Sequence, residues 1–105
     1  MVLDFIDSSP IGATRLKEFR RACSQDETFW AEKFKAFTAD EGNRSDREGI
    51  AFFRDELKRA QRTVKACNIV MAWIDGKSGK IDPPAEMQAE IQTAIWATQS
   101  GGIDG

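Results

Sequence analysis

The stretch "SDREGIAFFRDELKRAQRTVKACNIVMAWID", residues 45–75, decides the fold. Apolar residues recur through it at alternating steps of three and four, which is the spacing of one face of a long α-helix. This heptad seam consists of Ile50, Phe53, Leu57, Ala60, Val64, Cys67, Met71 and Ile74. Ser45 and Glu48 stand at capping-box spacing ahead of the seam. We therefore predict one helix from about Ser45 to Asp75, roughly 45 Å long.

Two shorter helical patterns precede the long one. The first begins at Ser9-Pro10, where a hydroxyl can cap free amides, and we expect it to end near Ser24. Its apolar face carries Leu16, Phe19 and Cys23. A capping-box spacing at Ser24 restarts a helix that runs to about Asp40, with Phe29, Trp30, Phe34 and Phe37 on its apolar side. The two are either nearly continuous or sharply bent at Ser24.

A last helix is predicted to start at Asp82-Pro83 and to fray by Gln99. The resulting fold is all-α, a single domain over residues 1–105. It is a small irregular bundle of three or four helices organised on the long helix, with residues 1–9 and 99–105 as flexible ends. One alternative makes residues 68–74, "NIVMAWI", a β-strand followed by a hairpin turn, because the stretch is rich in β-branched and aromatic residues.

Composition narrows the class of protein. The 105 residues carry a net charge of −2, so no overall charge favours nucleic acid or an acidic membrane. The cysteines Cys23 and Cys67 match no zinc or redox spacing, and we expect reduced, buried thiols in a cytoplasmic protein. Residues 1–10 lack the pattern of a signal peptide, and no apolar run of about 18 residues predicts a membrane span.

The loop "WIDGKSGKIDPPAE", residues 73–86, is similar in composition to two ligand-binding loops. A Walker A loop needs a further glycine five positions before Gly-Lys-Ser, but Met71 stands there. An EF-hand loop beginning at Asp75 would place Lys77 and Lys80 at its third and sixth positions, where an oxygen ligand and a glycine are required. The spacing excludes both sites, and we interpret the loop as a connector between helices.

The residue inventory also limits catalysis, because the chain has no His and no Tyr. A histidine-based triad and an imidazole-bound metal are excluded. The helical pair Glu86 and Glu90 is explained by helix-end electrostatics. We expect no catalytic residue, no cofactor and no metal, hence no enzyme. An enzyme would have to use carboxylates or lysines whose pKa values are shifted in a pocket.

The long helix carries a basic stripe opposite its seam. From Arg44 to Lys65 there are seven basic and four acidic residues. The stripe consists of Arg47, Arg54, Lys58, Arg62 and Lys65. It could contact an acidic protein or phosphates, but amphipathic helices routinely carry lysine and arginine on their solvated face, and that explanation is favoured. The acidic segments on both sides of it would repel a nucleic-acid backbone.

The same helix carries more apolar surface than one seam requires. Residues 69–74 are apolar on every face, so they are either buried on all sides or contact another molecule. Its length also exceeds that of any other predicted helix. Either the two N-terminal helices divide that length between them, or a second copy of the protein covers the remainder. The predicted partner or oligomer interface comprises Phe52, Ile69, Val70, Trp73 and Trp96.

These features favour a non-enzymatic protein-binding module: a small adaptor, inhibitor or assembly regulator that self-associates, as a homodimer, through the long helix. The alternative is a nucleic-acid-binding regulator that uses the basic stripe.

Overall fold

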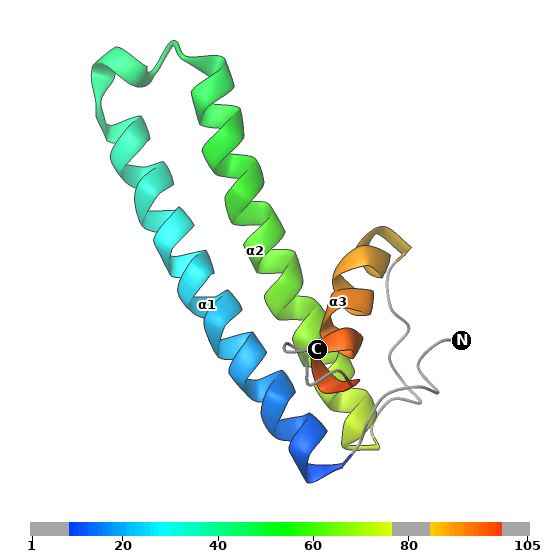
Figure 1. Cartoon of the computed structure of the whole chain (residues 1–105). Helices are drawn as coiled ribbons and strands as arrows, with labels where there is room; N and C mark the ends of the chain where they lie inside the picture. Colours follow the sequence, from blue (N-terminus) through cyan, green and yellow to red (C-terminus); the bar gives the residue numbers. More distant parts are fainter. Residues whose placement is uncertain (1–8, 77–84, 100–105) are drawn as a thin grey trace.

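The computed structural model describes residues 9–76 and 85–99, and these residues form helices without any strand (Figure 1). Helices α1 (Pro10–Ala39) and α2 (Arg47–Ile74) form an antiparallel hairpin, with the 3₁₀ turn η2 (Glu41–Asn43) at its tip. A second 3₁₀ turn, η4 (Ala85–Met87), leads into α3 (Gln88–Gln99), which packs against both long helices at the opposite end. The prediction of a small helical bundle is confirmed.

Local capping explains where the long helices begin and end. The Ser9 hydroxyl accepts a hydrogen bond from the Gly12 amide at 3.1 Å, ahead of Pro10 in the first turn of α1. The Asp46 carboxylate accepts one from the Gly49 amide at 3.0 Å, so Asp46, and not the predicted Ser45, caps α2. Helix α2 ends at Ile74, and Gly76 follows with a positive φ of 78°, a conformation that glycine adopts without strain.

The predicted end of a helix near Ser24 is wrong, because α1 continues through this residue for 30 residues in all. Ser24 does not act as a cap. Its carbonyl instead accepts a hydrogen bond from the Thr28 hydroxyl at 3.2 Å, a contact that Thr makes inside a helix. Cys23 and Trp30 are one heptad apart, so the apolar face stays in register. The alternative of a nearly continuous helix is the correct one.

The strand alternative for residues 68–74 is also wrong, since they form the end of α2. Helix α3 ends at Gln99 as predicted. The predicted start at Asp82-Pro83, the loop residues 77–84 and the chain ends 1–8 and 100–105 lie outside the described residues. Of the helices in the described part of the chain, none combines the length and the apolar character of a membrane span.

Among the described residues, the hydrophobic core lies where α3 covers the hairpin. Its buried members are Leu16, Ala66, Cys67, Ile69, Val70, Met87, Ile91, Ala94 and Ile95. Phe19, Met71, Trp73 and Ile74 pack against them while keeping partial exposure. Helix α1 packs on one side of residues 69–74 and α3 on another. This double cover accounts for apolar side chains on every face of α2 in this segment.

None of the described residues forms a third helix over the other half of the hairpin, residues 24–59, which we call the distal arm (Figure 1). At ~1.5 Å per residue, α2 is about 42 Å long and α3 about 18 Å, so α3 reaches along less than half of the hairpin. No residue from Lys17 to Arg59 is buried. Of the predicted seam, only Ala60 and Cys67 are buried.

Candidate protein interface

Five aromatic rings of the distal arm form one connected cluster, Phe29, Trp30, Phe37, Phe52 and Phe53, which we call the aromatic cluster. The centroid of the Trp30 ring lies 5.1 Å from that of Phe29, 5.8 Å from Phe52 and 6.1 Å from Phe53. Phe53 also contacts Phe37 at 4.9 Å. The Phe29 and Phe52 rings stand nearly perpendicular to Trp30, which is the favourable edge-to-face arrangement. The cluster therefore ties α1 to α2 where α3 is absent.

The aromatic cluster remains open to solvent. Phe29 is 48% exposed and Phe52 is 53% exposed. Trp30, Phe37 and Phe53 are only partly buried. A contiguous group of large apolar side chains at the surface is typical of a protein interaction site. Phe29 and Trp30 were predicted only to form an apolar helix face, and the missing signal was the absence of a third helix over them.

The exposed side of the distal arm continues the side on which α3 packs. Phe52 stands two heptads before Ala66, so both belong to the same stripe of α2. Ala66 is buried in the core with α3, and one turn earlier the Arg62 guanidinium lies 3.8 Å from Glu90 of α3. The face of the hairpin that α3 covers near the base therefore continues toward the tip, where none of the described helices covers it.

The structure does not bring the predicted interface residues together. Ile69 and Val70 are buried in the core, 8% and 0% exposed, so the prediction that a partner contacts them is corrected. Trp73 is partly exposed and packs against the same core. Phe52 belongs to the aromatic cluster, whereas Trp96, 52% exposed, lies on α3 at the other end of the hairpin.

All five residues of the predicted basic stripe are exposed. Two of them lie near carboxylates: Arg54 is 3.7 Å from Asp55, and Arg62 is 3.8 Å from Glu90. These neighbours reduce the positive potential that a nucleic-acid backbone would meet.

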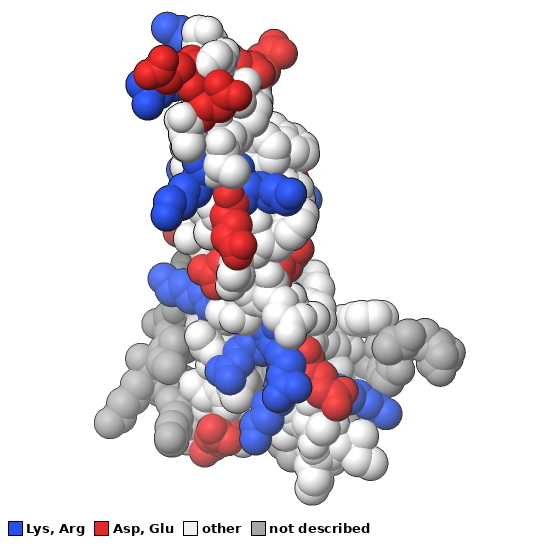
Figure 2. All heavy atoms as spheres, turned by 90° about the vertical axis from the view of Figure 1, so that its left-hand side faces the viewer, with Lys and Arg blue, Asp and Glu red and all other residues white. Residues whose placement is uncertain are grey.

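The charges on the α1 side of the hairpin are distributed unevenly. On the face where α1 is turned to the viewer, both signs of charge mix toward the tip, while basic side chains gather nearer the base (Figure 2).

The two cysteines, predicted separately as buried thiols, meet across the hairpin. The Cys23 and Cys67 side chains lie close enough for each thiol to affect the pKa of the other. Cys67 is buried as predicted, while Cys23 keeps partial exposure. Burial raises the pKa of Cys67 to about 12, and burial followed by the nearby Asp26 carboxylate raises the pKa of Cys23. Both thiols therefore stay protonated near neutral pH and are poor nucleophiles.

Comparison of the chain with protein-family models, with curated proteins and with solved structures gave no match. The residues and contacts of this chain must therefore carry any functional proposal.

Proposed function

We propose that this chain is a non-enzymatic protein-binding module, an adaptor, inhibitor or assembly regulator, that self-associates through its distal arm. The observation that carries the proposal is the half-exposed aromatic cluster in a segment where no residue is buried. At ~25 cal/mol per Å² of apolar area, covering such rings is a substantial driving force for association. Aromatic side chains are also the residues most enriched at binding hot spots.

The occupant that best fits this surface is a second copy of the chain. Two antiparallel helices with one open apolar face are half of a four-helix bundle, and a second distal arm supplies the other half at matching length. Such a dimer uses the same patch on both copies, related by a two-fold axis.

The charges on α1 favour this symmetric pairing. Asp26 stands three residues before Phe29 and Lys33 four residues after it, so the acid and the base lie on the same stripe at either side of the ring. The Lys33 ammonium lies 5.3 Å from the Phe29 ring centroid. If two arms pack antiparallel about an axis near Phe29, Asp26 of each copy faces Lys33 of the other. The rim of the cluster is thus self-complementary.

Light scattering after size-exclusion chromatography at micromolar concentrations tests the proposal. The wild type is expected as a dimer, and the double variant Phe29→Ser/Phe52→Ser as a folded monomer with its helical circular dichroism retained. Ile11→Ser is the matched control, because Ile11 is 62% exposed but lies at the start of α1. A wild type that stays monomeric at high micromolar concentration refutes self-association.

Charge exchange tests the orientation of the two copies. Asp26→Lys should weaken the dimer because it places like charges on the rim, and Asp26→Lys/Lys33→Asp should restore it. Like-charge contacts at an interface disfavour binding, whereas exchanged pairs keep complementarity. If the wild type is a dimer but the double variant does not recover dimerisation, the antiparallel arrangement is rejected. The aromatic cluster would then still be the proposed interface, with the two copies in another orientation.

A further inference from the structure

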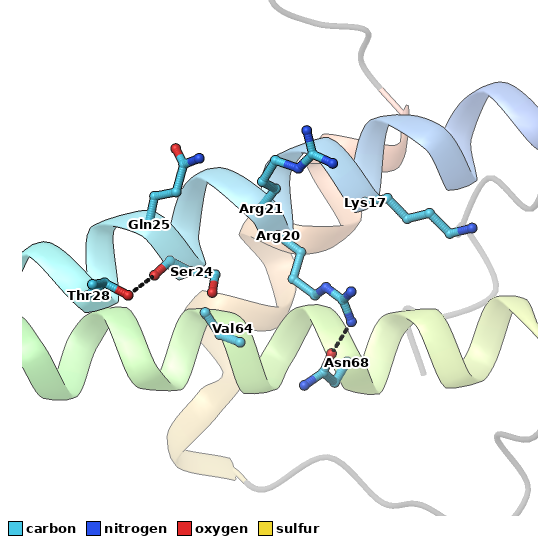
Figure 3. Close-up of a pocket in the computed structure, with 8 residues that line it drawn as sticks. All are labelled: Lys17, Arg20, Arg21, Ser24, Gln25, Thr28, Val64 and Asn68. Carbon is cyan, nitrogen blue, oxygen red and sulfur yellow. Dashed lines mark hydrogen bonds between the residues drawn. The ribbon is translucent and has the colours of Figure 1, made fainter.

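A separate pocket lies between α1 and α2, with a volume of about 540 Å³ (Figure 3). Six residues of α1 and two of α2 line it, among them Lys17, Arg20, Arg21, Ser24, Gln25 and Asn68. Its size falls within the range of small-molecule sites. Three of its residues are cationic and none is acidic, so its potential is positive.

Arg20 is held in place across the groove. Its Nη1 atom donates a hydrogen bond to Asn68 Oδ1 at 2.9 Å, and Figure 3 shows the side chain reaching from α1 toward α2. A guanidinium has five N–H donors, so one bond to Asn68 fixes the group and leaves the other donors for an anion. The pocket therefore contains a cation whose orientation is set before any ligand arrives.

The other polar groups of the pocket are hydroxyls and amides, each of which can donate a hydrogen bond. No carboxylate of the described residues lies within ion-pair distance of Lys17, Arg20 or Arg21. The Ser24 hydroxyl and the Gln25 amide make no hydrogen bond within the described part of the chain. An anion in the pocket would balance the charge of the cations and could accept a hydrogen bond from the Ser24 hydroxyl.

The spacing of the cations favours an extended anion. Lys17 and Arg21 are four residues apart, about 6 Å along α1, so the three cations extend over one helical turn. Two linked phosphate groups match this length better than one does. We propose that this pocket binds a diphosphate group, either as free pyrophosphate or as the diphosphate of a nucleotide.

Titration of ¹⁵N-labelled protein with inorganic pyrophosphate at constant ionic strength tests the site by NMR. Saturable shifts are expected at the amides of the pocket residues. Arg20→Gln/Arg21→Gln should weaken binding by about tenfold or more, because each lost charge-assisted contact is among the strong hydrogen bonds. Lys17→Gln should also weaken the binding of pyrophosphate. The Lys17 side chain makes no hydrogen bond or ion pair within the described structure, so its replacement removes a charge without breaking a contact.

The matched control is Arg54→Gln/Lys58→Gln, which removes the same charge from exposed positions outside the pocket. This variant should bind like the wild type. Absence of saturable shifts overturns the proposal, because pyrophosphate then has no specific site. Equal weakening in both double variants also overturns it, because binding would then be non-specific attraction. Equal affinity for ADP and pyrophosphate would identify the diphosphate alone as the ligand, and tighter binding of ADP would identify a nucleotide; both results uphold the site.

Discussion

Gly49, in the first turn of α2, lies directly against the Phe37 ring of α1. A Cβ atom on Gly49 would be 2.5 Å from Phe37 Cζ and 2.7 Å from the Asp46 Oδ2 atom that belongs to the cap of the same helix. The close approach of the two helices near the tip therefore depends on a residue without a side chain. Phe37 in turn contacts Phe53, so this packing extends into the aromatic cluster.

The first prediction is that Gly49→Ala destabilises the protein. Overpacking costs about 1–3 kcal/mol, which exceeds the gain of about 1 kcal/mol from the better helix propensity of Ala. We expect a net loss near 1 kcal/mol in urea denaturation. In a Phe37→Leu background, which removes the Cζ atom, the same change should be less costly. A Gly49→Ala variant as stable as the wild type would contradict the close contact.

A second prediction concerns the cap of α2. Asp46→Ala should lower the free energy of unfolding by about 1 kcal/mol, because the Gly49 amide loses its acceptor. Asp46→Asn keeps an oxygen acceptor and should cost less. Ser45→Ala should have almost no effect. Equal losses at positions 45 and 46, measured by the same denaturation experiment, would restore the sequence-based assignment of the cap to Ser45.

A third prediction separates the core from the distal arm. Leu16 is fully buried among residues of α2 and α3, so Leu16→Ala should cost about 2–5 kcal/mol. Phe52 is half exposed, and Phe52→Ser should cost about 1 kcal/mol or less in dilute, monomeric protein. Thermal denaturation followed by circular dichroism compares the two. A larger loss for the Phe52 variant under these conditions would place the stabilising core in the distal arm.

A fourth prediction follows from the Cys67 thiol. Its pKa is about 12 when folded, against 9.0 for an ordinary thiol, so the unfolded chain ionises first as the pH rises. The unfolded state then binds fewer protons than the folded state, and stability should fall between about pH 9 and pH 12.

Denaturation of wild type and Cys67→Ala at pH 8 and pH 10 measures this effect. The variant should lose less stability over the interval than the wild type. A thiol reagent at pH 8 should also label Cys23, which is partly exposed, faster than Cys67. Equal labelling rates in the folded protein would show that Cys67 is not sealed in the core.

Much of the fold could be predicted from local patterns. The heptad seam predicted α2 to within two residues at each end, and Ser9 with Pro10 marked the start of α1. Ser24 misled the prediction because a capping-box spacing also occurs inside a continuous helix, where Ser and Thr bond to carbonyls within the helix. The residues predicted as one interface do not share a surface: Phe52 is exposed, whereas Ile69 and Val70 are buried in the core. The role of Phe52 as a partner contact stays a prediction.

The sequence by itself determined the helices, because their apolar periodicity and their caps depend on residues close together in the chain. Only the tertiary structure decided which apolar faces are covered. Helix α3 packs over Ile69 and Val70 and stops short of Phe29 and Phe52, and the position of one helix on another depends on contacts between distant residues. The meeting of Cys23 with Cys67, and of Arg20 with Asn68, has the same origin. Spacing along the chain does not encode which residues of two separate helices come to lie at the same level.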